Sequence, residues 1–198
     1  MARIDARWKV TLAALALAPL AACGAPKADG NATAQSSYAA AFGGPFALTA
    51  PDGKTVSNET LKGKPYAIFF GFTRCPDVCP TTLARMARLR QQLGADGNKF
   101  AIVFVSVDPE HDKPADIGRY VTLFGTPVIG LTGDKAHLAQ AVKAFGVYYE
   151  KVPQPGGDYT IDHTASVYLM DRAGGFVTTI DHAESDANAL AKIKRIIS

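Results

Sequence analysis

Three short runs of the chain are apolar at nearly every position, and each predicts a β-strand buried on both faces. They cover residues 66–72, 100–107 and 164–170. Continuous apolar runs of about four to eight residues are typical of strands inside a covered sheet. The turn-forming segment 171–175 follows the third run, and residues 176–180 then predict an antiparallel partner, because so short a connection cannot cross over the sheet. A further strand is expected at 46–49, before a tight turn.

Four other segments carry apolar side chains at helical spacing. They cover residues 80–93, 114–124, 134–145 and 185–197. Asp134 and Ser185 are suitable N-cap residues, and Gly146 is a suitable stop signal. Strands that alternate with helices, followed by a hairpin and a closing helix, predict an α/β fold of thioredoxin-like order. We therefore expect one thioredoxin-like domain over residues 45–198, with a central mixed sheet flanked by helices.

The first 22 residues carry the pattern of a secretory signal. Three basic residues precede a short apolar stretch, which is too short for a membrane-spanning helix of roughly 20 residues. The stretch ends at Ala22-Cys23-Gly24 and resembles a bacterial lipobox, in which the cysteine is lipidated and becomes the new N-terminus. We predict a lipoprotein signal peptide at 1–22, a lipid anchor on Cys23 and a flexible stalk at 23–44. Ordinary signal-peptidase cleavage nearby is the alternative.

Composition and charge narrow the function classes. The chain has 198 residues, of which 47% are hydrophobic and 20% are charged, and this suits one globular domain. Its formal net charge of +3 falls to +1 without residues 1–22, which hold three bases and one acid. So balanced a chain lacks the clustered positive charge of a nucleic-acid binder. Of its three cysteines, the lipid anchor would account for one and leave a pair.

That pair, Cys75 and Cys79, lies where the first buried run meets the first long helix. Functional groups commonly gather at the carboxyl ends of parallel strands. In the first turn of a helix, unpaired backbone N–H groups and the helix dipole favour a thiolate over a thiol. Three interpretations stay open: a structural disulfide, a redox-active pair and a two-thiolate metal site. A disulfide across so short a loop would add little entropic stabilisation.

One of the four histidines is placed to complete a metal site. His163 directly precedes the third buried run, and in a thioredoxin-like sheet the loop before this strand faces the cysteine turn. Two sulfurs and one imidazole nitrogen form a soft, three-coordinate set that suits copper. His111, after the second run, is a second candidate. His137 is expected on a solvated helix face, and His182 in a turn.

Three separated motifs resemble those of the Sco/SenC family of copper chaperones. They read Gly-Phe-Thr-Arg-Cys-Pro-Asp-Val-Cys-Pro at 71–80, Ser-Val-Asp-Pro-Glu at 106–110 and Asp-Tyr-Thr-Ile-Asp-His-Thr-Ala at 158–165. The similarity extends from about residue 42 to the C-terminus. It implies a thioredoxin-like fold that binds one copper ion through Cys75, Cys79 and His163. Asp77 and Asp162 would be acidic neighbours of this site and not ligands.

The resemblance also implies a function. The protein would deliver copper to the dinuclear copper centre of cytochrome c oxidase, or help to assemble it, on the periplasmic face of a bacterial membrane. Its partners would be the copper subunit of the oxidase, a periplasmic copper donor and a thiol reductant, and not a nucleic acid. The same cysteines, Cys75 and Cys79, also suit a thiol–disulfide reductase that keeps the cysteines of the oxidase reduced, so enzymatic activity stays open.

Overall fold

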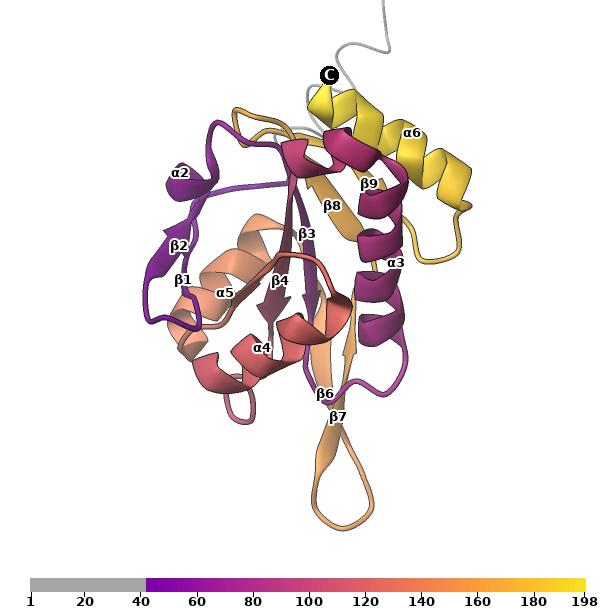
Figure 1. Cartoon of the computed structure of the whole chain (residues 1–198). Coiled ribbons are helices and arrows are strands. Elements are labelled where there is room, and N and C mark those ends of the chain that lie inside the picture. Colours follow the sequence, from indigo (N-terminus) through magenta and orange to yellow (C-terminus); the bar gives the residue numbers. More distant parts are fainter. Residues whose placement is uncertain (1–41) are drawn as a thin grey trace, which may run out of the picture.

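A computed structural model describes residues 42–198 of the chain (Figure 1). The predicted signal peptide, Cys23 and most of the predicted stalk lie outside the described residues. Phe42 already packs on the domain, since its ring centroid lies 5.0 Å from that of Phe176 and 5.9 Å from that of Tyr168. Among residues 42–198, no helix combines the length and the apolar character that crossing a membrane requires.

A five-stranded mixed sheet forms the centre of the domain, in the order β5-β4-β3-β8-β9. The strands are β3 (Tyr66–Gly71), β4 (Ala101–Ser106), β5 (Val128–Leu131), β8 (Val167–Met170) and β9 (Phe176–Ile180). β3, β4 and β5 are parallel, whereas β8 and β9 run antiparallel to their neighbours. Every residue of β3, β4 and β8 is buried, which confirms a buried strand in each of the three apolar runs, although β8 begins at Val167 and not at residue 164 as predicted.

Helices cover both faces of this sheet, as predicted. They are α3 (Val78–Gln92), α4 (Pro114–Val121), α5 (Lys135–Ala144) and α6 (Asp186–Ile197), with 3₁₀ helices η1 (Gly94–Lys99) and η2 (Thr122–Phe124). Side chains alternate along a strand, so neighbouring residues of β3 face opposite layers. Phe69 packs on Phe104, which contacts Tyr120 of α4, whereas Phe70 packs on Phe145 after α5. In Figure 1, α3 and α4 lie in front of the sheet and α5 lies behind it.

The ends of the helices follow local sequence signals. The side chain of Asp134 accepts a hydrogen bond from the amide of His137, and that of Ser185 accepts one from Asn188, so both predicted N-caps are confirmed. α4 ends earlier than predicted because the chain tightens into η2 and then reverses at Gly125, where φ is 62°.

Besides the 3₁₀ helix η1, three parts of the structure were wholly or partly missed by the sequence analysis. A small N-terminal unit contains β1 (Ala47–Thr49), β2 (Thr55–Ser57) and α2 (Asn58–Leu61), of which only β1 was expected. The edge strand β5 was also missed. The third part is a two-stranded hairpin, β6 (Tyr149–Pro153) and β7 (Tyr159–His163), which extends below the sheet in Figure 1. His163 therefore ends a strand, and the expectation that it lies in a loop was wrong.

Candidate metal and thiol site

The two cysteines are presented by the turn between β3 and α3. Cys75 lies in the turn and is half-buried, whereas Cys79 is the second residue of α3 and is fully buried. The backbone N–H of Cys79 points at the Cys75 sulfur, 3.4 Å away. Both cysteines are free thiols in the structure. The helix N-terminus thus holds the two sulfurs on one side of its first turn, as the spacing predicts.

Gly71, the last residue of β3, makes room for the buried sulfur. A Cβ atom added at this position would lie 2.6 Å from Sγ of Cys79 and 3.1 Å from the ring of Phe104. Only a residue without a side chain allows so close an approach, which gives this glycine a role in placing Cys79.

His163 approaches the sulfurs from the hairpin. Its Nε2 atom lies 3.4 Å from Sγ of Cys79, and its ring stands edge-on to those of Phe69 and Phe72. Its Nδ1 atom lies 3.0 Å from the backbone carbonyl of Thr164. Because a carbonyl can only accept, Nδ1 carries the proton and Nε2 presents its lone pair to the cysteines. This tautomer suits a metal ligand.

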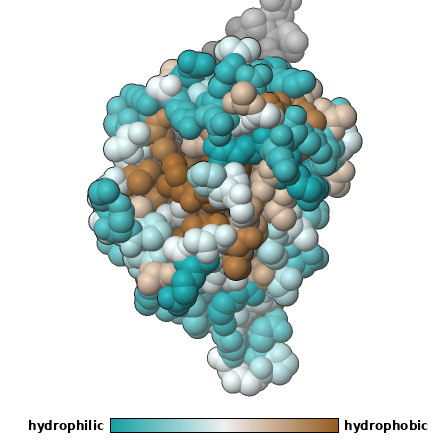
Figure 2. Space-filling model, viewed as in Figure 1, coloured by the Kyte–Doolittle hydropathy of each residue, from teal (hydrophilic) through white to brown (hydrophobic). Residues whose placement is uncertain are grey.

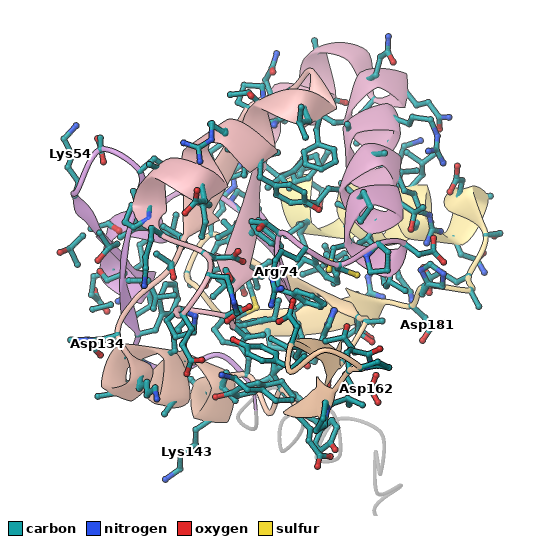
Figure 3. All side chains as sticks on the ribbon, turned by 90° about the horizontal axis from the view of Figure 1, so that it is seen from below. Lys54, Arg74, Asp134, Lys143, Asp162 and Asp181 are labelled. Carbon is teal, nitrogen blue, oxygen red and sulfur yellow. The ribbon has the colours of Figure 1, made fainter. Side chains whose placement is uncertain are left out.

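The structure therefore brings together all three residues that the sequence nominated. The sulfurs of Cys75 and Cys79 and a ring nitrogen of His163 all lie within 4.8 Å of one another. A cavity of about 200 Å³ opens beside them, and Val78 and Asp162 are among the residues that line it. Figure 3 views this end of the molecule from below and labels Arg74 on the cysteine turn and Asp162 on the hairpin.

The two thiols differ in acidity. A hydrogen bond from Cys79, assisted by the backbone amides of Cys79 and Asp77, lowers the pKa of Cys75 to about 3. The neighbouring Cys75 sulfur, together with burial, raises the pKa of Cys79 above its usual range. The pair thus combines an accessible thiolate with a buried thiol, which suits both soft-metal binding and thiol–disulfide exchange.

The other candidates lie apart from this group. Of the described residues, only Cys75, Cys79 and His163 form a cluster that could hold a metal ion. His111 contacts Asp108 instead, with 3.0 Å between its Nδ1 and the carboxylate. His137 pairs with Asp134 at the start of α5, and His182 is exposed in the turn after β9, as expected for both. Asp77 and Asp162 are exposed beside the cavity.

Two buried carboxylates behind the site were missed by the sequence analysis. Asp112 accepts hydrogen bonds from the backbone N–H and the hydroxyl of Thr73, at 2.8 and 2.5 Å, and from the hydroxyl of Ser106. Asp108 is fully buried and accepts a bond from the hydroxyl of Tyr159. The sequence signal that could have found them is an acidic residue that follows a buried strand. A carboxylate that is buried there requires hydrogen-bond donors such as these.

Fold and site together define a thioredoxin-like protein in which a dithiol and an imidazole meet at the carboxyl edge of the central strands. The family model described as SCO1/SenC matches residues 34–198. The chain belongs to the SCO1/SenC family, and the resemblance carried by its three motifs is confirmed.

Solved structures and curated relatives agree with this assignment. The structure of Bradyrhizobium japonicum ScoI with copper bound is similar to this one: the two chains are 47% identical, with a TM-score of 0.73 over 79% of this chain and 99% of that one. BsSco, titled a member of the Sco family of cytochrome c oxidase assembly proteins with a disulfide switch, is 28% identical, with a TM-score of 0.63 over 79% and 94%. The mitochondrial SCO1 homolog 1 of Arabidopsis thaliana is 39% identical over 70% of this chain and 42% of its own length. The chain thus spans less than half of that curated relative.

Proposed function

We propose that this protein is a copper metallochaperone that delivers copper to, or helps to assemble, the dinuclear copper centre of cytochrome c oxidase. The observation that carries the proposal is the set of three soft donor atoms, from Cys75, Cys79 and His163, within 4.8 Å of one another. Two thiolates and one imidazole match Cu(I), which favours soft ligands and low coordination numbers. The copper-bound relative of the same fold supports this choice of metal.

In this proposal copper is cargo. Binding displaces the remaining thiol proton, so affinity for copper rises with pH. The Nε2 lone pair of His163 already faces the sulfurs, and the neighbouring cavity leaves one side of the group accessible. Ligands of a partner can enter on that side before the chain's own ligands leave. Transfer is then an exchange of ligands that needs no change in the oxidation state of the metal.

The cysteine pair also acts as a gate for copper loading. A disulfide between Cys75 and Cys79 has no thiolate left to bind copper, and forming it from one thiolate and one thiol gives two electrons and one proton to an oxidant. Restoring the dithiol requires a thiol reductant as an external partner. The disulfide switch named for BsSco supports a gate of this kind.

We place the protein on the periplasmic face of a bacterial membrane. The secretory pattern of residues 1–22 and the cysteine at position 23 support a lipid anchor, followed by a stalk that carries the copper domain. Its partners there are the copper subunit of the oxidase, a copper donor and the thiol reductant.

The second candidate function is a thiol–disulfide reductase that acts on the cysteines of the oxidase. The contrast in acidity favours it, since Cys75 is an accessible thiolate that could attack a partner disulfide, and Cys79 could then resolve the mixed disulfide. The reaction leaves Cys75 and Cys79 oxidised and the partner cysteines reduced.

The deciding experiment measures Cu(I) stoichiometry, affinity by chelator competition and disulfide-reductase turnover on the same reduced preparations. We expect one copper per chain in the wild type and loss of tight binding in Cys75→Ser and Cys79→Ser. His163→Ala should weaken affinity by more than the roughly 10- to 100-fold that follows loss of a residue that merely orients a ligand. It should leave thiol–disulfide exchange largely intact.

His137→Ala is the matched control, because this histidine is exposed at the start of α5 and should retain wild-type affinity. Wild-type affinity in His163→Ala would refute the ligand assignment. Reductase turnover without tight copper binding would refute the chaperone and favour the enzyme, whereas copper binding without turnover would exclude the enzyme.

A further inference from the structure

The hairpin that carries His163 contributes few buried residues to the domain. Among the described residues, β6 and β7 form a two-stranded sheet of their own, separate from the five central strands. In β7 only Ile161 is buried, and β6 has no buried residue. Figure 2 shows the hairpin as largely hydrophilic, in contrast to the apolar surface higher on the same face. Apart from the contacts of the His163 ring with Phe69 and Phe72, apolar burial is therefore a weak restraint on the position of the hairpin.

A cluster of polar contacts supplies the missing restraint at Tyr159, the first residue of β7. The Tyr159 hydroxyl donates a hydrogen bond to Asp108 with an O···O distance of 2.6 Å, and this carboxylate is fully buried. The same hydroxyl lies 2.9 Å from Nδ1 of His111. Bonds to a buried carboxylate are among the strongest in proteins, so the loss of this one weakens the attachment even though His111 and Arg74 also contact Asp108.

Arg74 adds a second connection, from the cysteine turn, and also contacts Asp108 with 3.5 Å between Nη2 and the carboxylate. It directly precedes Cys75, and its Nη1 atom contacts Asp158 of the hairpin at 2.7 Å. Its Nη2 atom donates to the backbone carbonyl of Tyr159 at 3.4 Å, and its guanidinium lies over the Tyr159 ring, 5.3 Å from the centroid. The neighbour of one sulfur ligand thus binds the strand that bears the imidazole ligand.

We propose that these four residues, Arg74, Asp108, Asp158 and Tyr159, act as a clasp that positions His163 against the sulfurs and thereby sets how long the site retains copper. The inference rests on the proposed function. Tyr159 and His163 are the two ends of one strand, about 13 Å apart at roughly 3.3 Å per residue. Metal–ligand distances tolerate only about 0.2 Å. A small rotation of β7 about a loosened Tyr159 would therefore move Nε2 out of ligand range.

The first test examines the metal-free protein. Tyr159→Phe removes the hydroxyl bonds and keeps the ring on Arg74, and Tyr149→Phe is the matched control. Tyr149 is on the same hairpin, opposite His163, and no described residue bonds to its hydroxyl. We expect hydrogen exchange of the β6–β7 amides to quicken about tenfold in Tyr159→Phe, in keeping with loss of one bond to a buried charge. Tyr149→Phe should match the wild type. Equal exchange in all three proteins would overturn the clasp.

The second test follows release of Cu(I) to a chelator from the loaded protein. Tyr159→Phe should release copper about tenfold faster than the wild type, with an unchanged alkylation rate of Cys75 in the metal-free form. In a His163→Ala background, Tyr159→Phe should have no further effect, because the clasp acts through the imidazole. A residue needed only for folding would add its effect in both backgrounds.

The outcomes separate the two proposals. If the wild type binds copper and Tyr159→Phe releases it at the same rate, the clasp is refuted and the chaperone function stands. If acceleration persists without His163, the clasp is also refuted, since Tyr159 would then act through the cysteines. If the wild type retains no copper, both the proposed function and this inference are overturned.

Discussion

The two halves of the site are built differently. The sulfur half consists of β3, in which every residue is buried, and the first turn of α3 that holds the Cys79 thiol. The imidazole half is a largely exposed hairpin, outside the central sheet, which polar side chains hold in place. The sulfurs are therefore fixed by the packing that stabilises the whole domain, whereas His163 is fixed by a few local bonds. This difference would suit a carrier of copper, because the imidazole could move away from the metal without unfolding the protein.

The largest expected difference between the two halves is in the free energy of unfolding that each loses when an apolar side chain is shortened. Phe104 is fully buried between Phe69 and Tyr120, and its ring lies beside Gly71, which is also close to Sγ of Cys79. Phe104→Ala should lower the free energy of unfolding by about 3–5 kcal/mol. Val152→Ala, in the partly exposed hairpin, should lower it by about 1 kcal/mol or less. Urea denaturation measures both, and equal losses would contradict the contrast between packed and clasped halves.

The next effect concerns the acidity of the two thiols. Because the pKa of Cys75 is lowered to about 3, its thiolate persists between pH 4 and 8, where a free cysteine is mostly protonated. At pH 5 its alkylation should exceed that of free cysteine by about tenfold, since the gain in thiolate outweighs the lower nucleophilicity of a weaker base. Cys79 should stay unmodified because it is buried and its pKa is raised. Mass spectrometry after iodoacetamide treatment identifies the labelled residue.

Substitutions in each half of the site show which half lowers the pKa of Cys75. The largest cause of the lowered pKa is the hydrogen bond from Cys79. Cys79→Ala should therefore reduce alkylation at pH 5 more than His163→Ala does. The reverse order would show that the hairpin, and not the sulfur half, governs the thiolate. The same depressed pKa makes Cys75 stabilise the fold above its unfolded value near 8.5, and this contribution is lost as pH falls toward 3.

The sequence predicts the sulfur half much better than the imidazole half. Continuous apolar runs identify β3, β4 and β8, and the position of Cys75 and Cys79 after such a run places them at a helix N-terminus. β6 and β7 gave no such signal, because the segment is mostly exposed and Pro153 and Pro155 interrupt it. The three candidate ligand residues could be nominated from motifs, although His163 was assigned to a loop.

Contacts between distant segments could not be predicted. The bonds that hold His163 in place join Asp108 to Tyr159, 51 residues apart, and Arg74 to Asp158, 84 residues apart. An acidic residue after a strand is as compatible with solvent as with burial, and only the fold shows that Asp108 and Asp112 are buried. Hydrophobic periodicity over short stretches of sequence does not indicate which distant residues contact each other.

The smallest effect is expected at the outer ion pair of the hairpin, between Lys151 and Glu110. Their charged atoms lie 2.7 Å apart and both side chains are partly exposed, which makes the pair sensitive to salt. The pair lowers the pKa of Glu110 to about 2, so its contribution is present above the usual glutamate pKa and is lost as pH falls toward 2. Glu110→Gln should slightly speed hydrogen exchange of the hairpin at low salt and have no effect at 1 M salt. Glu59→Gln, which breaks an exposed pair with Lys62 in the N-terminal unit, should leave hairpin exchange unchanged at either salt concentration. Tyr159→Phe should speed exchange equally at both, because its partner is buried and unscreened. A Tyr159 effect that disappeared in high salt would mean that surface charge alone holds the imidazole half in place.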